Sequence, residues 1–214
     1  IVDGEHIYVH FGHQGTACTN LDGEIQWVDR THSYPPVHGN GGSPILVDDK
    51  LIICCDGGDV AYTYAISKSN GKELWRTERD AGSRQTFSFC TPQLIVVNGA
   101  KQVISPGSDI VQSLDPETGK VIWSLRFKGY SVIPRPLFHD GLVYISTGYM
   151  NPQVLAIDPS GSGDVTDTHL KWSAKAAAPH TPSLVPHADT VVMISDSGIA
   201  AAVETKTGKE RWKK

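Results

Sequence analysis

Four cysteines are the first candidates for chemistry, at Cys18, Cys54, Cys55 and Cys90. No pair has the C-x-x-C spacing typical of zinc or redox sites, so neither kind of site is predicted. Cys54 and Cys55 are adjacent and end the apolar stretch LIICC, which is typical of a strand. Because successive residues of a strand point to opposite faces, we expect two separate buried thiols.

The segment GSGDVTDTH, residues 161–169, is a second candidate because it carries Asp164 and Asp167. It is an insertion: fourteen residues separate Asp158 from Trp172, whereas eight separate the corresponding Asp and Trp of the related phrase SLDPETGKVIW. Calcium sites need a longer ladder of oxygen ligands than two carboxylates provide. We therefore expect a solvated turn without a metal, and keep Asp164 and Asp167 as the weak alternative for Ca²⁺.

Histidines and catalytic motifs give no stronger signal. His6 and His10 share one face of the expected strand HIYVHF, but no third ligand lies at metal-binding spacing. We expect both to face solvent. The sequence contains no G-x-S-x-G, Walker or H-E-x-x-H motif, so it predicts neither a hydrolase nor a nucleotide site.

The strongest pattern is a repeat in which a tryptophan follows a glycine by four residues, as in TGKVIW. The tryptophans step by 48, 48, 49 and 40 residues and lie at Trp27, Trp75, Trp123, Trp172 and Trp212. The preceding glycines are Gly23, Gly71, Gly119 and Gly208. A second marker, a residue followed by proline, begins at positions 43, 91, 135 and 181 and steps by 48, 44 and 46 residues. A period of this length is typical of propellers or solenoids.

Each unit is predicted to contain four short strands. In the third unit these are PQLIVV, KQVISP, IVQSLD and KVIWSL, which are rich in β-branched residues and bounded by turn residues. Turn pairs that tolerate positive φ follow each proline marker: Asp48-Asp49, Asn98-Gly99, Asp140-Gly141 and Ala188-Asp189. The fold class is therefore all-β, a propeller of four-stranded antiparallel blades. We expect one domain over residues 1–214, with blades at about 1–30 (incomplete), 43–79, 90–127, 135–175 and 181–214.

The repeated tryptophan has a structural role in this fold. A blade cannot cover both faces of its own sheet, so a large ring at one fixed position can pack on the neighbouring blade while its N–H binds a carbonyl. The preceding glycine allows the turn and leaves a flat surface. We therefore interpret these residues as docking elements between blades, not as catalytic groups.

Composition excludes other classes. The net charge is −4 and the basic residues are scattered, so no nucleic-acid surface is predicted. No apolar run approaches membrane-spanning length. The chain starts IVDGEHIYVHF and ends two residues after Trp212, so both ends are expected to cut through structure.

The phrases SLDPETGKVIW and AVETKTGKERW resemble the tryptophan-docking motif of quinoprotein-type (PQQ-like) β-propellers. The resemblance covers essentially the whole chain and is nearest to the bacterial BamB-like group of the outer-membrane assembly machinery. It implies a ring of seven or eight blades, whose missing blades come from the rest of the chain or from another chain; a closed five-blade ring is the alternative. It also implies a periplasmic or extracytoplasmic location.

Ligands of propellers usually bind at one mouth of the central channel. The residues at or just before each proline marker are expected there, so the binding candidates are His38, Tyr130, Arg135 and His180. They would form a polar, anion-friendly patch. The alternative is that they only cap loops and bind nearby carbonyls.

The predicted function is a non-catalytic scaffold that binds a protein or glycan partner and carries no cofactor. The alternative implied by the resemblance is a dehydrogenase or cofactor-binding propeller that uses PQQ and calcium. Quinoprotein alcohol dehydrogenases have a disulfide between adjacent cysteines, which Cys54 and Cys55 would have to supply, and Arg135 would be the cationic partner of the quinone. No set of Asp, Glu and Asn for the calcium stands out near the expected mouth.

Overall fold

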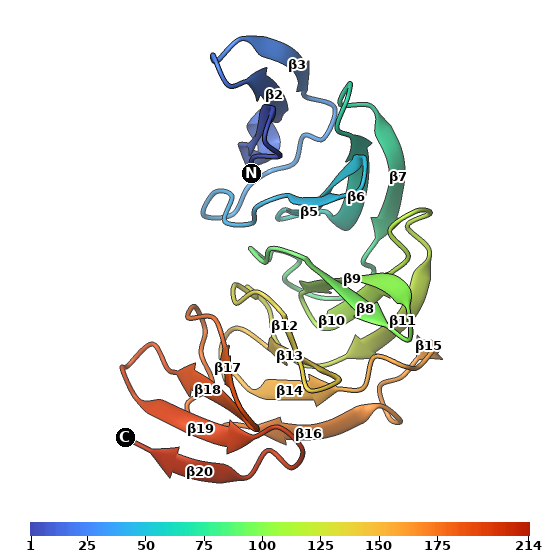
Figure 1. The fold of residues 1–214 in the computed structure, drawn as a ribbon. Helices are drawn as coiled ribbons and strands as arrows, with labels where there is room; N and C mark the ends of the chain where they lie inside the picture. The colour runs from blue at the N-terminus through green and yellow to red at the C-terminus, as the bar shows by residue number, and fades with distance from the viewer.

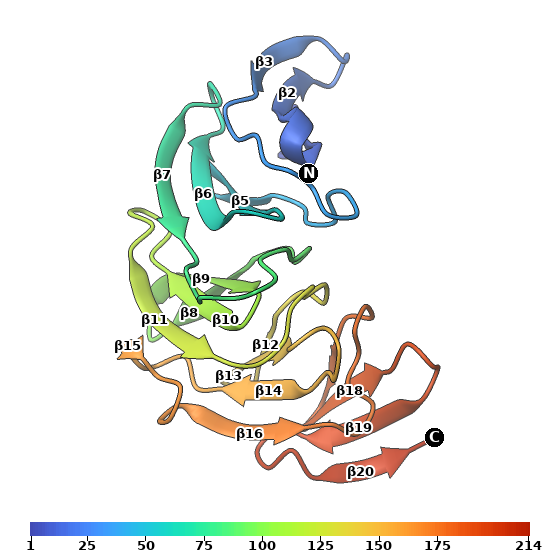
Figure 2. The same ribbon diagram turned by 180° about the vertical axis from the view of Figure 1, so that it is seen from behind.

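The computed structural model describes residues 1–214 as five sheets that follow one another around an open arc and are antiparallel apart from one short parallel strand in the third (Figure 1). Each sheet is one repeat unit, here called blades 1 to 5. Seen from behind, the same arc places blade 1 and blade 5 at opposite ends (Figure 2). The all-β propeller predicted from the repeat is confirmed, and the closed five-blade ring is not formed.

The strands follow the chain from blade to blade. Blade 1 contains β1 (His6–His10), the short 3-10 helix η1 (Gly12–Gln14), β2 (Thr16–Asn20) and β3 (Ile25–Asp29). Blade 2 contains β4 (Ile45–Val47), β5 (Lys50–Asp56), β6 (Ala61–Ser67) and β7 (Glu73–Glu78). Blade 3 contains β8 (Gln93–Val97), β9 (Ala100–Gly107), β10 (Ile110–Leu114) and β11 (Val121–Arg126).

The last two blades have the same order. Blade 4 contains β12 (Leu137–His139), β13 (Leu142–Ser146), β14 (Val154–Ile157) and β16 (Leu170–Ala174). Blade 5 contains β17 (Val185–His187), β18 (Thr190–Ile194), β19 (Ala200–Glu204) and β20 (Glu210–Lys213). The first hairpin of blades 2 to 5 turns at a residue with positive φ, namely Asp48, Asn98, Asp140 and Ala188. These are the turn pairs that the sequence predicted.

The hydrophobic core is divided into four clusters, one at each junction between blades. At the junction of blades 2 and 3, for example, Ile52 and Trp75 of blade 2 pack against Val103 and Leu114 of blade 3. No cluster lies within a single sheet. Burial therefore stabilises the blades only as neighbours, as expected for a repeat protein.

Three tryptophans pack on the glycine turn of the next blade. A Cβ at Gly71, Gly119 or Gly208 would come within 2.6 Å of the indole of Trp27, Trp75 or Trp172 respectively. The indole N–H of each donates to a carbonyl in the same turn, at Lys68 (3.0 Å), Pro116 (3.0 Å) and Thr205 (2.8 Å). A side chain larger than hydrogen at the glycine would separate the two blades.

Trp123 departs from this arrangement. It is fully buried, and its indole N–H donates to the side-chain oxygen of Gln102 at 3.1 Å. The amide nitrogen of Gln102 in turn donates to the carbonyl of Pro159 in blade 4 at 3.3 Å. Gln102 therefore relays the contact between Trp123 and the next blade.

The insertion before Trp172 explains this difference. Residues Gly163–Asp164 form β15, which pairs in parallel with β11 and adds a fifth strand to blade 3. Val165 follows it into the core between blades 3 and 4. The segment was predicted to be a solvated turn; that prediction is wrong for its first half, because backbone pairing and burial of Val165 fix it across two blades.

His10 also corrects a prediction. The strand face shared by His6, Tyr8 and His10 packs towards blade 2 at Tyr8, which is 2% exposed and shares a core cluster with residues of β5 and β6. His6, at the start of the strand, keeps 36% of its side chain exposed. His10 is half-buried, its Nδ1 lies 2.9 Å from Thr16 Oγ1, and its Nε2 is buried without a partner. Burial, together with the neighbouring His32, lowers the pKa of His10 to about 4.

Candidate functional site

Two sets of loops meet on one face of the arc, here called the loop face. One set enters the first strand of blades 2 to 5, and the other joins the second and third strands of those blades. Backbone hydrogen bonds tie the sets together, for example Gly58 N–H to Pro35 O at 3.0 Å and Asp109 N–H to Gly129 O at 2.7 Å. The loop face is therefore a supported surface and not a collection of free loops.

Six rings on the loop face form a continuous chain of contacts, here called the aromatic row. Its members are His38, Phe87, Phe89, Tyr130, Tyr149 and His180. Neighbouring centroids are 5.3 to 6.4 Å apart, and several pairs meet edge to face. Edge-to-face contacts orient the rings beyond what apolar burial alone would do. The row crosses from the loop entering blade 2 to the loop entering blade 5.

The structure brings three of the four predicted binding residues into this row. His38, Tyr130 and His180 are connected through Phe87 and Tyr149. Arg135 is exposed and makes no hydrogen bond or ion pair. Phe87 lies in the loop that enters blade 3, so aligning the loops of successive blades could have indicated it as a member of the row. Tyr149 lies in the loop between β13 and β14, which contains no proline marker.

The row is more aromatic than cationic. His180 is held by Asp196, whose Oδ2 lies 3.3 Å from His180 Nδ1 and accepts the His180 backbone N–H at 2.6 Å. Partial burial raises the pKa of Asp196, but hydrogen bonds from Thr181 and from the His180 backbone lower it overall. A carboxylate thus sits beside one of the two histidines that were expected to favour an anion.

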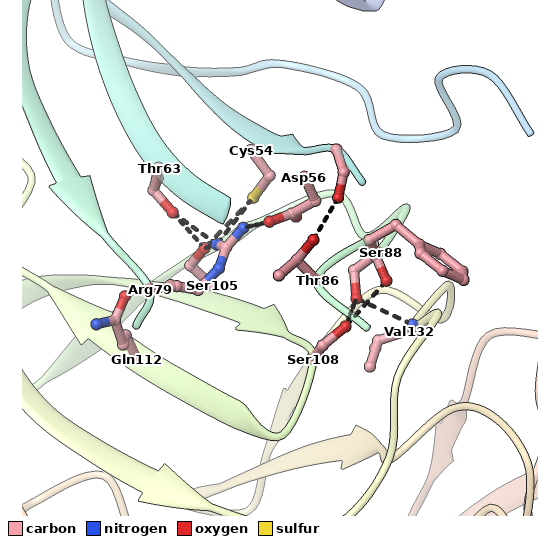
Figure 3. Close-up of polar contacts among 12 residues, drawn as sticks. Cys54, Asp56, Thr63, Arg79, Thr86, Ser88, Ser105, Ser108, Gln112 and Val132 are labelled. Atoms are coloured by element: carbon pink, nitrogen blue, oxygen red, sulfur yellow. Dashed lines mark hydrogen bonds and ion pairs between the residues drawn. The ribbon is translucent and has the colours of Figure 1, made fainter. Parts of the chain in front are cut away.

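Short contacts fix the loops that carry the row. Phe89 N–H donates to Val132 O at 2.8 Å and Ser131 N–H donates to Phe87 O at 3.1 Å, which joins the loops entering blades 3 and 4. Two serines beneath them, Ser88 and Ser108, add hydrogen bonds to Val132 N–H and Phe87 O (Figure 3). The aromatic rings are therefore presented by an ordered backbone.

A buried ion pair anchors the same loops at the junction of blades 2 and 3. The Arg79 guanidinium donates to the Asp56 carboxylate, and both side chains are 1% exposed (Figure 3). Arg79 also donates to Thr63 at 2.8 Å and to Ser105. Burial raises the pKa of Asp56 to about 6, against the opposing effect of Arg79. Neither residue was selected from the sequence, because no local motif marks a contact that only blade packing creates.

The cysteines show no features of a reactive site. All four are free and buried. Cys54 points towards blade 3, with its Sγ 3.3 Å from Ser105 Oγ, whereas Cys55 belongs to the core on the blade 1 side. Burial raises the pKa of Cys54, and it raises the pKa of Cys55 to about 12. The two adjacent thiols therefore lie on opposite faces of β5, as the strand pattern predicted.

The residues present do not fit a calcium–quinone site. No group of three or more His, Cys, Asp or Glu side chains is arranged to hold a metal ion. Asp164 Oδ1 accepts from the backbone and hydroxyl of Thr166, at 3.0 and 2.6 Å, and Asp167 is exposed. Cys54 and Cys55 diverge and cannot cover a planar ring together. We derive no redox step through these residues.

The docking residues are placed as follows. Gly71, Gly119 and Gly208 each contact an indole, but the turn at Gly23 has nothing within 4 Å of its Cβ position. Trp212 lies on the last strand and is 42% exposed. These two residues stand at the opposite ends of the arc.

Comparison with known proteins identifies the family. The sequence profile described as outer membrane protein assembly factor BamB matches residues 1–99 and 64–214, which together span the chain. No curated protein sequence matches. No helix in the structure is long and apolar enough to cross a bilayer.

Three solved structures share the fold. BamB from Moraxella catarrhalis superposes with a TM-score of 0.70 at 17% identity, over 98% of this chain and 57% of that one. Quinohemoprotein alcohol dehydrogenase ADHIIG from Pseudomonas putida HK5 gives 0.66 at 15% identity, over 100% of this chain and 41% of that one. A europium-containing methanol dehydrogenase gives 0.71 at 13% identity, over 100% and 50%.

These likenesses establish the fold and not the activity, because each identity is low. The chain spans only about half the length of the three structures. The match of the family profile over the whole sequence is the decisive finding, and it agrees with the repeated docking phrase and the antiparallel blades. The chain belongs to the BamB family of PQQ-like β-propeller repeat proteins.

Proposed function

We propose that the chain is a non-catalytic scaffold, located outside the cytoplasm, that binds a protein partner through its loop face. The family is described by its part in outer membrane protein assembly, which supports a partner from that process. The partner would recognise the aromatic row and Met150, which follows Tyr149 of the row.

The aromatic row and the adjacent Tyr149-Met150 segment carry this proposal. Tyr149 is 48% exposed and Met150 is 63% exposed, although both are large and apolar. His180 Nε2 lies 3.3 Å from the Met150 carbonyl, so this segment is joined to the row and does not stand apart. Aromatic and methionine side chains are enriched at protein interfaces. Most of the binding energy there comes from a few residues, among which tyrosine is common.

Rigidity strengthens the argument. Backbone and side-chain hydrogen bonds join the loops of the row to one another and, through Thr86 and Gly57, to the buried Arg79–Asp56 pair (Figure 3). A surface that is ordered before binding loses less conformational entropy when the partner docks. The arrangement suits recognition of a partner.

The proposal is tested by complementation. The chain is exported to the periplasm of a bacterium that lacks BamB, and the level of assembled outer membrane proteins is measured. We expect partial restoration by the wild-type chain and its loss in the double variant Tyr149→Ala, Met150→Ala. Leu74→Ala is the matched control, because Leu74 is 47% exposed on β7, away from the loop face. Equal activity of the double variant and the control would refute a role for the loop face.

The quinoprotein alternative has a separate test. Two of the structures that share the fold are alcohol or methanol dehydrogenases, so PQQ and Ca²⁺ are added together to the purified chain. We expect neither a new absorbance band nor a shift of the melting temperature. A saturable shift that needs both additions would favour a cofactor-binding propeller.

A further inference from the structure

The sulfur-containing side chains differ sharply in their exposure to solvent. The chain has four cysteines and two methionines. All four cysteines are free and buried, and Met193 is 1% exposed in the core between blades 4 and 5. Met150, in contrast, is 63% exposed. It is therefore the one sulfur-containing side chain that lies mostly in solvent.

The thiols are also poor targets for oxidants. The thiolate is the form of cysteine that reacts, and it forms only when the thiol loses its proton. Burial raises the pKa of Cys18, Cys54 and Cys90, and it raises the pKa of Cys55 to about 12. The thioether of methionine needs no deprotonation to react. We therefore expect an oxidant to reach Met150 before any thiol of the native chain.

Met150 is exposed because of the way its loop is held. The loop joins β13 to β14 in blade 4. Tyr149 N–H donates to Tyr130 O at 2.7 Å, and the Met150 carbonyl lies 3.3 Å from His180 Nε2. Blade 4 lies between blades 3 and 5 (Figure 1). The exposure of Met150 thus belongs to the interior of the arc and does not arise where the chain begins or ends.

Oxidation would change what Met150 offers to a partner. The thioether is flexible and apolar, whereas the sulfoxide is polar. Met150 follows Tyr149, which is 48% exposed and belongs to the aromatic row. A polar group placed in an apolar contact loses its water without gaining an equivalent hydrogen bond. A sulfoxide at Met150 should therefore weaken a contact made by the loop face.

We propose that Met150 is a reversible oxidation switch on the loop face: a peroxide converts its thioether to the sulfoxide, which weakens partner binding. A lone pair of the sulfur attacks one peroxide oxygen, so an S–O bond forms as the O–O bond breaks. The sulfur is oxidised, and hydrogen peroxide is reduced to water, which keeps both of its protons. A methionine sulfoxide reductase with a thiol reductant would return the thioether and release the oxygen as water. The effect on binding rests on the proposed function, whereas the site of oxidation does not.

Peptide mapping by mass spectrometry tests the site. The purified chain is treated with hydrogen peroxide, quenched and digested, and each peptide is examined for the gain of one oxygen atom. We expect the Met150 peptide to be converted while the peptides of Met193 and the four cysteines stay unchanged. In urea, which unfolds the chain, the two methionine peptides should be converted at similar rates. Equal conversion of the two methionines in the native chain, or no conversion of Met150, would overturn the proposal.

Hydrophobic interaction chromatography of the native chain tests the change in surface character. We expect the oxidised wild-type chain to elute earlier than the untreated chain, and methionine sulfoxide reductases A and B together to restore the original elution. Met150→Leu is the matched control: peroxide should not shift its elution relative to its own untreated sample. An equal shift in Met150→Leu, or no shift in a fully converted wild-type chain, would contradict the proposal.

Complementation of the bacterium that lacks BamB then tests the effect on the partner. Met150→Gln places a polar group of similar length at this position, whereas Met150→Leu keeps an apolar side chain of similar volume. We expect Met150→Gln to restore less assembled outer membrane protein than Met150→Leu. Equal restoration by the two variants would refute the switch. If the wild-type chain itself restored nothing, the proposed function would fail, and the peptide map and the chromatography would still decide whether Met150 is the oxidation site.

Discussion

Gly119→Ala gives the sharpest test of how the blades are held together. Gly119 has a φ of +71°, and a Cβ there would lie 2.6 Å from Trp75 Cε3, 2.7 Å from Trp75 Cδ2 and 2.9 Å from Thr77 Oγ1. Trp75 is 8% exposed and its N–H is held by the Pro116 carbonyl, so the ring cannot move away freely. The added methyl group must therefore push blades 2 and 3 apart.

The expected cost has two parts. A left-handed backbone costs an L-residue about 1–2 kcal/mol. Overpacking a tight contact costs a further ~1–3 kcal/mol. Gly119→Ala should thus lower the free energy of unfolding by roughly 2–5 kcal/mol. Gly99→Ala carries only the first part, because Gly99 has a φ of +81° and nothing within 4 Å, and should cost about 1–2 kcal/mol.

Urea unfolding followed by circular dichroism measures both variants. A double-mutant cycle with Trp75→Ala then isolates the contact. Removing the ring should reduce the cost of Gly119→Ala towards that of Gly99→Ala, since only the 2.9 Å approach to Thr77 Oγ1 then remains. If Gly119→Ala were no more destabilising than Gly99→Ala, or if its cost were unchanged without the indole, the docking role assigned to these residues would be wrong.

Three further predictions concern buried polar groups. Asp56→Asn should lower the free energy of unfolding, measured in urea, by about 3–5 kcal/mol because it leaves the Arg79 charge buried and unpaired. Replacing both partners, Asp56→Leu with Arg79→Met, should recover much of that loss. Gln102→Leu should cost ~1–3 kcal/mol by orphaning the Trp123 N–H, and Gln102→Leu with Trp123→Phe should cost less than the sum of the two single changes. His10 should make the native state less stable as pH falls from about 6.5 towards 4, because only the unfolded chain takes up the proton in that range. The free energy of unfolding of the wild-type chain should therefore fall by about 3 kcal/mol over this range through His10. The same pH series on His10→Gln should lack that component.

Local sequence patterns predicted the fold because each blade repeats the same turn residues and strand patterns. The turns at Asn98 and Asp140 have positive φ, and the strands on either side of each turn pair with each other in antiparallel fashion. The period of the tryptophans then fixed the length of a blade. For the same reason the divergence of Cys54 and Cys55 could be predicted from strand alternation alone.

The candidate site was only partly predictable. His38, Tyr130 and His180 were selected because equivalent loop positions of successive blades must lie side by side, and the row that joins them follows from that rule. Tyr149 was missed because it comes from a different loop of blade 4, which lies beside Tyr130 through backbone hydrogen bonds and a ring contact between residues 130 and 149. Its part in the site depends on contacts that no local pattern marks.

The amino-acid sequence determined the strands, the turns, the order of the blades and the three tryptophans that pack on a glycine turn, Trp27, Trp75 and Trp172, since all of these depend on periodicity within about fifty residues. Tertiary structure decided the rest: the burial of His10, the Gln102 relay to Trp123, the pairing of β15 with β11 and the Arg79–Asp56 pair. Each of these joins residues of different blades or different strands through side-chain packing. Burial and hydrogen bonding of that kind are set by how whole sheets meet, so they become visible only once neighbouring blades are in place.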